Sequence, residues 1–467
     1  MDRYDLVIRN GKLVDPEKYQ FSSGAIGVKN GKIAVITKGE IYGKEEIDAD
    51  GQFVSPGFID VHGHIDGHHE FAELALVQGV TTTVGGNCGL SPINLKEFFA
   101  TENQLGFPIH QTQLIGHSFT LRQRVGAIDP FLPASAQQIR QMVDLTEKAL
   151  EDGAIGLSFG LEYAPGTSFE EIIALSQVAA KYGRLIAIHT RMLSCGDLAS
   201  LTEAINISLI TGARVLISHF VYQYGCGLMN KALSIVDQAR HDGIDVWIDS
   251  GLYTAFASFV GTPVFSEKYM TEFGWKPEDL MAATGKYCGR RLTRQTYQDM
   301  RANYPNDSVI CFTGNETDIY EPFRRDYTMV SSDIGPTPTG STREGHPQNT
   351  GTFPRFFRKL VREKQILSLL DAVVKCTLLP AETFGLNTKG RLKEGADADL
   401  VIWNIERIND CADFPGIGRP DAPPEGIAYV IVNGKIATRD NHIQKGVFSG
   451  RTIQPQSTAD PKLSQAG

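Results

Sequence analysis

The sequence predicts an α/β fold, a metal-dependent (β/α)₈ TIM barrel with a small β-sandwich domain built from both ends of the chain. Three observations predict it. Apolar and polar residues alternate at both ends of the 467-residue chain. Between those ends, short apolar strands alternate with helical stretches. Histidine and aspartate residues follow the ends of the central strands. A chain of this length accommodates a barrel of about 250 residues and a second domain.

The alternating pattern at the two ends is typical of antiparallel strands. It runs through DLVIRNGKLVD and GAIGVKNGKIAVI, where Asn10-Gly11 and Asn30-Gly31 are turn pairs. It returns in ADLVIWN and AYVIVNGKIATRD near the other end. We therefore expect residues 1–54 and 386–452 to form one β-sandwich, and residues 453–467 to be a polar, poorly ordered tail.

The central segment, residues 55–385, predicts the barrel. It contains eight strand candidates, in the order FVSPGFIDVHGH, GVTTTVGG, QTQLIGHS, AIGLSFG, RLIAIHT, ARVLISH, DVWIDS and YTMVSSD, of which the first begins just before residue 55. Helical stretches such as 170–183 and 230–243 separate most of them, and eight parallel strands with crossover helices close into a barrel. The connection from about 250 to 326 is much longer than the others. We expect it to carry elements of a substrate pocket or a lid.

Composition excludes several classes of partner. The formal net charge is −9 at pH 7, whereas nucleic acid or an anionic membrane favours a basic surface. No apolar run approaches the roughly 18 residues of a membrane span. The seven cysteines have no repeated spacing and predict no disulfide framework. We expect a cytoplasmic protein that acts on a small molecule, with its oligomeric state left open.

Polar side chains follow most of the predicted barrel strands, and active sites of such barrels gather at the carboxyl ends of the strands. Only the fourth strand lacks one. Residues two apart share one face of a strand, so both imidazoles of the first strand can point at one metal ion. Each group alone usually has a structural role, but independent roles would not gather them at one rim. In strand order the candidates are His62 and His64, Asn87 and Cys88, His117, His189, His219, Asp249 and Asp333.

Motifs spread over nearly the whole chain carry a resemblance to a known family. PGFIDVHGHID and GRLKEGADADLVIWN are similar to motifs found throughout the amidohydrolase superfamily. GNCG, after the second strand, and GLEYAPG, after the fourth, are much more specific. Through them the chain resembles the N-acyl-D-amino-acid deacylase (D-aminoacylase) branch of that superfamily.

The resemblance implies a zinc enzyme. Many amidohydrolases bridge two metals with a carboxylated lysine from the fourth strand, where this chain offers only Glu162. The deacylase branch uses a cysteine after the second strand instead, which falls on Cys88. The number of metals, and whether Cys88 bridges them, stay open. The implied tight zinc site consists of Cys88, His189 and His219, and a second, weaker position of His62, His64 and Asp333.

The implied reaction is hydrolysis of a carbon–nitrogen bond other than a peptide bond, through attack by a metal-generated hydroxide. Asp333 would accept the proton of the water and then pass it to the departing nitrogen, because an amide nitrogen leaves poorly unless it is protonated. Tyr163 and Tyr253 are candidate contacts to the substrate or the oxyanion, and Gln348 is a third candidate substrate contact.

The carboxylate-binding residues of D-aminoacylases have no counterpart at the matching positions. Those enzymes use a lysine just after the sixth-strand histidine and an arginine shortly before GTFPR. Here the first position reads His219-Phe220-Val221, and the second region carries Gln348. A neutral amide cannot form the bidentate, charge-assisted pair that selects a carboxylate. Three arginines elsewhere could take this role: Arg191, Arg343 and Arg355.

Several functions therefore stay open. The first is deacylation of an N-acyl-D-amino acid or a related N-acyl compound. The alternative is a cyclic-amide hydrolase of the hydantoinase or dihydroorotase type, acting on a substrate without that carboxylate, although such enzymes normally carry the strand-four lysine. A deaminase fits less well, because that branch usually uses a different ligand set. A non-catalytic scaffold of the same fold is a remote alternative, since all six candidate ligands are present. Asn87 and His117 could orient ligands or simply bond to loops.

Overall fold

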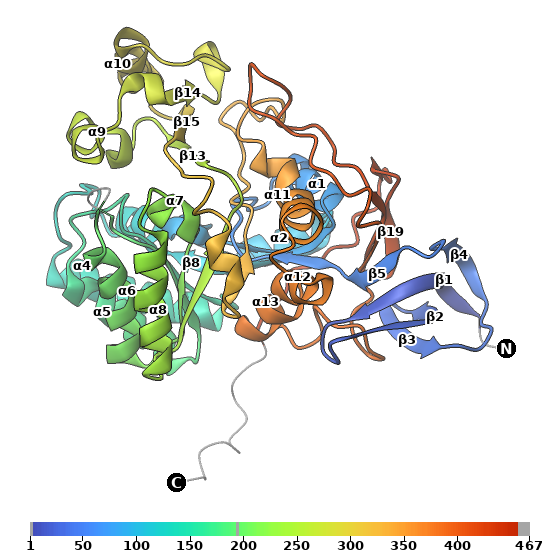
Figure 1. Ribbon diagram of the computed structural model, residues 1–467. Coiled ribbons are helices and arrows are strands. Elements are labelled where there is room, and N and C mark those ends of the chain that lie inside the picture. The colour runs from blue at the N-terminus through green and yellow to red at the C-terminus, as the bar shows by residue number, and fades with distance from the viewer. Residues whose placement is uncertain (1–2, 193–195, 456–467) are drawn as a thin grey trace.

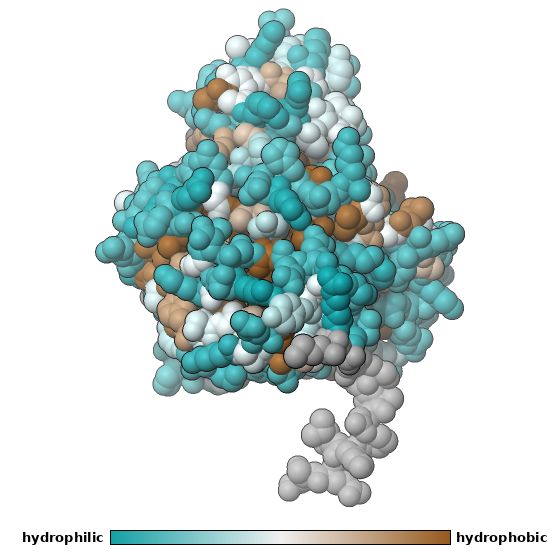
Figure 2. All heavy atoms as spheres, turned by 90° about the vertical axis from the view of Figure 1, so that its right-hand side faces the viewer, coloured by the Kyte–Doolittle hydropathy of each residue, from teal (hydrophilic) through white to brown (hydrophobic). Residues whose placement is uncertain are grey.

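The structure, a computed structural model, describes residues 3–192 and 196–455. A barrel of parallel strands is surrounded by helices. A sheet domain lies at one side of the barrel, and a smaller insertion lies above the barrel (Figure 1). The predicted α/β fold class, with a domain of strands from both ends, is confirmed. The face that carries the sheet domain is mostly hydrophilic, with apolar residues in scattered patches (Figure 2).

The predicted domain boundaries, 1–54, 55–385 and 386–452, stay a proposal. Of the predicted tail, residues 456–467 lie outside the described residues. Within the part of the chain that the structure describes, no helix combines the length and the apolar character that crossing a bilayer requires.

Eight parallel strands form the barrel, one from each predicted strand segment. The first and last strands are joined by a parallel bridge between Gly63 and Ile334. Two backbone hydrogen bonds support this closure: the His64 N–H donates to Ile334 O at 2.6 Å, and the Asp333 N–H donates to His62 O at 2.8 Å. In chain order the strands are β6 (Phe58–Asp60), β7 (Val80–Gly85), β8 (His110–Gly116), β9 (Gly156–Gly160), β10 (Leu185–His189), β11 (Val215–Ile217), β12 (Val246–Ser250) and β16 (Thr328–Val330).

Helices pack against the outside of the barrel and bury their apolar residues in its largest core. Ser135 begins one of them with a reciprocal capping box to Gln138, which satisfies free backbone N–H groups at the helix start. The two helical stretches predicted at 170–183 and 230–243 correspond to α5 and α8. The main helices are α1 (His69–Val77), α2 (Leu95–Leu105), α4 (Ala136–Glu151), α5 (Phe169–Lys181), α6 (Ala199–Thr211), α8 (Met229–His241), α12 (Leu369–Cys376) and α13 (Leu378–Thr383).

Both ends of the chain contribute to one nine-stranded sheet. Its two halves meet where β5 pairs antiparallel with β17. The predicted first barrel strand is therefore divided, since 53–56 belong to this sheet and 58–60 to the barrel. Gly57 separates them, and a Cβ there would collide with the side chain of Thr81. The strands are β1 (Tyr4–Asp15), β2 (Gln20–Lys29), β3 (Lys32–Thr37), β4 (Gly43–Asp48), β5 (Phe53–Pro56), β17 (Leu400–Trp403), β18 (Ile427–Val432), β19 (Lys435–Arg439) and β20 (His442–Ile443).

The long connection between β12 and β16 forms a small unit of its own above the barrel (Figure 1). Three antiparallel strands make its sheet, in the order β13-β15-β14. Apolar residues of these strands and of the neighbouring helices form a separate core. We call this unit the insertion. Its elements are β13 (Ala255–Phe259), α9 (Glu267–Phe273), β14 (Leu280–Ala282), α10 (Arg294–Asn303) and β15 (Ser308–Phe312).

A buried cluster of charges joins the barrel to the end sheet. The Asp399 carboxylate lies 3.1 Å from His110 Nε2 of β8 and 2.6 Å from Lys389 Nζ. It also accepts a hydrogen bond from the backbone N–H of Asn433 at 2.7 Å. Burial alone would raise the pKa of Asp399, but His110 and Lys389 lower it far below its usual value. The carboxylate is therefore ionised and depends on its partners.

We expect Lys389→Met to destabilise the protein by about 3 kcal/mol, because it leaves a buried carboxylate short of its main partner. Lys32→Met is the matched control: Lys32 also pairs with an aspartate, Asp397, but its side chain is 46% exposed, and its loss should cost less than about 1 kcal/mol. Urea denaturation measures both free energies of unfolding. Equal losses in the two variants would contradict the role given to Asp399.

Candidate metal centre

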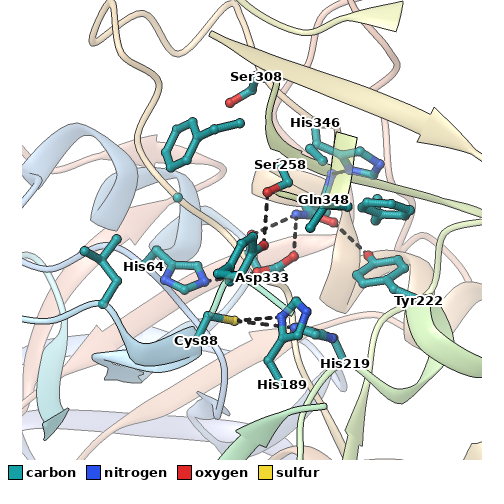
Figure 3. A pocket seen from close by; sticks show the side chains of 18 of the residues that line it. His64, Cys88, His189, His219, Tyr222, Ser258, Ser308, Asp333, His346 and Gln348 are labelled. Carbon is teal, nitrogen blue, oxygen red and sulfur yellow. Dashed lines mark hydrogen bonds and ion pairs between the residues drawn. The ribbon is translucent and has the colours of Figure 1, made fainter. Parts of the chain in front are cut away.

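The thiol of Cys88 lies at the centre of a cluster of imidazoles (Figure 3). Its Sγ is 3.3 Å from His62 Nε2. It is 3.4 Å from His189 Nδ1 and 3.5 Å from His219 Nε2. Each of these residues ends, or directly follows, a different barrel strand, so the parallel direction of the strands brings them to one rim.

Asp333 and His64 complete the cluster. Asp333 Oδ1 lies 3.3 Å from His64 Nε2 and 3.6 Å from His62 Nε2. All six residues predicted as metal ligands thus lie together. His62 belongs to both halves of the cluster, and its Nε2 is closer to Cys88 Sγ than is either histidine that the resemblance grouped with Cys88.

Three residues of the cluster adopt positive φ angles that residues other than glycine rarely take: 52° at Cys88, 33° at His219 and 57° at Asp333. Such conformations persist only where neighbouring contacts hold them. At His219 the Asp249 carboxylate accepts the backbone N–H at 2.7 Å. Near Cys88, the backbone of Gly160 approaches so closely that any Cβ there would collide with the Cys88 carbonyl.

Two carboxylates, those of Glu162 and Asp60, hold in place histidines that contact Cys88. Glu162 Oε2 lies 2.6 Å from His189 Nε2, which leaves the other ring nitrogen to face Cys88. Asp60 accepts the backbone N–H of His62 at 3.2 Å. Metal-binding histidines commonly have such a carboxylate partner. The roles of Glu162 and Asp60 were missed from sequence, although Glu162 stands where many relatives carry lysine and Asp60 lies two residues before His62.

The donor set fits a zinc ion. Ligand atoms of His62, Cys88 and His219 lie within 4.8 Å of one another, and so do those of His62, His64 and Asp333. Burial alone would raise the pKa of the Cys88 thiol, but the imidazoles of His62, His189 and His219 lower it well below its ordinary value. A thiolate, imidazole nitrogens and a carboxylate are donors that zinc favours.

The cluster opens into a cavity of about 380 Å³ between the barrel rim and the insertion. Barrel loops supply Phe119, Tyr163 and Met192, and the insertion supplies Phe256 and Trp275. The prediction that the long connection carries pocket elements is therefore in accord with the structure. Figure 3 shows Ser258 and Ser308 of the insertion opposite Cys88.

Comparisons with known proteins agree with this site. A family model described as "Amidohydrolase family" matches residues 45–132 and 326–438. An N-acyl-D-glutamate deacylase of Alcaligenes xylosoxydans xylosoxydans is 29% identical, covering 93% of each chain. A D-aminoacylase of the same organism is 29% identical over 96% of this chain and 97% of its own.

The structure of this chain is also similar to solved structures. An N-acyl-D-glutamate deacylase from Bordetella bronchiseptica, complexed with zinc and a phosphonate inhibitor, superimposes with a TM-score of 0.83 at 28% identity. The alignment covers 97% of this chain and 100% of that one. The chain is thus similar to members of the amidohydrolase family over most of its length. The predicted resemblance to the D-aminoacylase branch and the predicted enzyme class, a hydrolase of carbon–nitrogen bonds other than peptide bonds, are confirmed with it.

The two tyrosines predicted as substrate contacts differ in position. Tyr163 lines the cavity, its ring centroid 4.8 Å from that of His189 and its hydroxyl 3.0 Å from Ser258 Oγ. Tyr253, predicted as a substrate contact, is not among the residues that line the cavity. Its hydroxyl donates to the Pro347 carbonyl at 3.3 Å, and its ring packs under Arg355. A turn after β12 directs it into the protein, so it is a packing residue.

Tyr222 lines the cavity instead, and it was missed from sequence. It lies in the short helix α7 (Phe220–Tyr224), directly after His219. Its hydroxyl donates to Gln348 Oε1 at 2.8 Å, and Gln348 Nε2 donates to the Asp333 carbonyl at 2.7 Å. Gln348 begins α11 (Gln348–Phe356). It lines the cavity while bonding the backbone of Asp333, and its predicted contact with a substrate stays a prediction.

The two residues whose roles stayed open have local partners. His117 Nε2 lies 2.8 Å from Glu171 Oε1, and Arg122 donates to the same carboxylate at 2.8 Å. Asn87 Nδ2 donates to the Val84 carbonyl at 2.9 Å and shapes the turn that presents Cys88. His117 thus supports the fold beside the site, whereas Asn87 supports the turn that carries a ligand.

We expect Glu162→Gln to weaken zinc binding about 10- to 100-fold, because the carboxylate orients His189 and makes it more basic. Glu171→Gln is the matched control, since Glu171 is also buried and also contacts a histidine, but away from Cys88. Competition with a chelator measures both affinities. Unchanged zinc affinity in Glu162→Gln would contradict the role given to this carboxylate.

Proposed function

We propose that this protein is a zinc-dependent amidohydrolase that removes the acyl group from the nitrogen of a small N-acyl compound. The observation that carries the proposal is the gathering of six candidate ligands around the Cys88 thiol, beside one cavity. Cys88, His189 and His219 would hold a first ion. His62, His64 and Asp333 would hold a second where two are bound. The N-acyl-D-glutamate deacylase and the D-aminoacylase among its relatives are deacylases by name.

When bound, zinc would polarise the scissile carbonyl and lower the pKa of a water molecule. The proton transfers would be carried out by Asp333. Burial alone would raise the pKa of its carboxyl, but His64 and His62 lower it, so the group is ionised at neutral pH. It can then accept a proton from the attacking water and return it to the departing nitrogen. Gln348 Nε2 holds the backbone of Asp333 through its carbonyl at 2.7 Å and lies 3.5 Å from the carboxylate oxygen Oδ2.

Tyr163 is the best-placed group for the developing oxyanion. Burial raises the pKa of its phenol well above the ordinary value, so it keeps its proton at neutral pH and can donate a hydrogen bond. Its hydroxyl shares the cavity wall with Ser258. A preorganised donor of this kind stabilises negative charge on a carbonyl oxygen.

One observation keeps the cyclic-amide alternative in view: no described residue that lines the cavity is lysine or arginine. D-hydantoinase from a Thermus species shares the fold at 17% identity and a TM-score of 0.65. Against this alternative, the loop after β9 presents Glu162, which is already bonded to His189.

The deciding experiment incubates the purified zinc protein with N-acetyl-D-amino acids, their uncharged N-acyl analogues and cyclic amides. Released amine and acid report each turnover. We expect hydrolysis of open-chain N-acyl compounds. Turnover of cyclic amides alone would overturn deacylation in favour of the alternative.

We expect Asp333→Asn to lower kcat by about 10²- to 10⁴-fold, because the amide cannot take up the proton. Zinc held by Cys88, His189 and His219 should remain, and mass spectrometry of the native protein measures it. Loss of both zinc and activity would show instead that Asp333 serves mainly to bind metal.

A further inference from the structure

We propose that the substrate is an uncharged amide that carries an aromatic or other apolar group, and that a free carboxylate is selected against. This inference deepens the proposed function and rests on it. Hydrolysis adds water across the amide: the carbon–nitrogen bond breaks, the acyl carbon takes the hydroxyl and the nitrogen takes a proton. The proposal concerns what else the substrate carries, and two features of the cavity wall decide it.

The first feature is the charge of the wall. Among the described residues that line the cavity, the ionisable side chains are acids, tyrosines, histidines and Cys88, with neither lysine nor arginine. The acids are Asp66, Glu162 and Asp333. A carboxylate is held by charge-assisted hydrogen bonds, most often from arginine. Burying it beside acids, without such a partner, costs free energy. The wall therefore disfavours an anionic substituent.

Two of the three candidate arginines are bound elsewhere, and the third, Arg343, is exposed and does not line the cavity. Arg191 forms an ion pair with Glu203 at 2.9 Å and donates to the Thr167 carbonyl at 3.0 Å. Arg355 pairs with Asp410 at 3.0 Å and donates to the Leu252 carbonyl at 3.0 Å. Neither lines the cavity. Moving Arg191 inward would leave the half-buried Glu203 without its partner, and moving Arg355 inward would break its bonds to Asp410 and Leu252.

The polar groups opposite the metal ligands are neutral and mutually bonded. Gln348 accepts from Tyr222 and donates to the Asp333 carbonyl, so its amide is largely engaged within the protein (Figure 3). His346 accepts the Gln348 N–H on Nδ1 at 3.0 Å. Burial lowers the pKa of His346 to about 3, so this imidazole carries no charge at neutral pH. This side of the cavity offers dipoles to a substrate and no positive charge.

The second feature is an aromatic wall on the insertion. Trp275 stacks on Phe273 with ring centroids 4.3 Å apart and planes inclined by 17°. Its centroid lies 5.7 Å from that of Phe256 on β13. On the barrel rim, Phe119 packs against Tyr163 at 5.2 Å. All five rings line the cavity. Such a surface binds apolar and aromatic groups by burial and by ring contacts.

The test compares two compounds that differ only in charge: N-acetyl-D-phenylalanine and its primary amide, N-acetyl-D-phenylalaninamide. Acetate release is measured at pH 8, where an ordinary imidazole is uncharged. We expect kcat/KM to be at least about tenfold higher for the amide, because the acid must lose its hydration without gaining a cation. An acid hydrolysed as well as the amide, or better, overturns this proposal and leaves deacylation standing.

If neither compound releases acetate while the protein holds zinc, deacylation itself fails. Calorimetric binding of the same two compounds to the zinc protein then decides the present proposal. Tighter binding of the amide supports it, and equal or tighter binding of the acid overturns it.

The aromatic wall has its own test, with Trp247→Ala as the matched control. Trp247 lies outside the cavity and packs its ring under Arg240 at 4.5 Å. Trp275→Ala should lower kcat/KM for N-acetylphenethylamine about tenfold relative to that for N-methylacetamide. Phe256→Leu, a milder change in the same wall, should lower the ratio in the same direction. An unchanged ratio in both wall variants, as in the control, overturns the role of the wall.

Discussion

The contact on which the site depends is that of a buried thiol with three imidazoles. A thiolate is costly to bury by itself, and so is a cluster of histidine nitrogens without partners. Together they stabilise one another, since the imidazoles lower the pKa of Cys88 and its sulfur gives each ring nitrogen something to face. A divalent ion satisfies the same groups at once. The unusual backbone conformations at Cys88 and His219 are local costs that this arrangement offsets.

The site and the barrel closure use the same residues. β6 and β16 meet through backbone bonds made by His62, His64 and Asp333, whose side chains also belong to the metal cluster. Asp60 strengthens this junction by accepting N–H groups from both His62 and Ser332. Closing the barrel therefore places half of the ligand set. The precision of the site then comes from strand pairing, which is more rigid than a loop.

The eight barrel strands and the gathering of the six candidate ligands could be predicted because they follow from periodicity and from the position of polar residues at strand ends. The division of FVSPGFID between two sheets could not, since nothing in an apolar run tells which neighbour each half will pair with. Tyr253 and Tyr222 both follow strands, and only the turn geometry after β12 directs one away from the cavity. The positions of the Arg191 and Arg355 side chains depend on ion pairs with carboxylates elsewhere in the chain. Local sequence patterns do not predict which carboxylate pairs with which arginine.

The insertion between β12 and β16 separates substrate recognition from the reaction centre, two properties that many enzymes combine in one set of residues. The ligands lie on the barrel rim, whereas much of the aromatic wall lies on a unit with its own small core. Mutations in that unit can remodel what enters the cavity without disturbing the strand ends that carry the chemistry. The insertion can therefore be exchanged as a unit, by natural variation or by laboratory recombination. A change of substrate does not then require a new reaction centre.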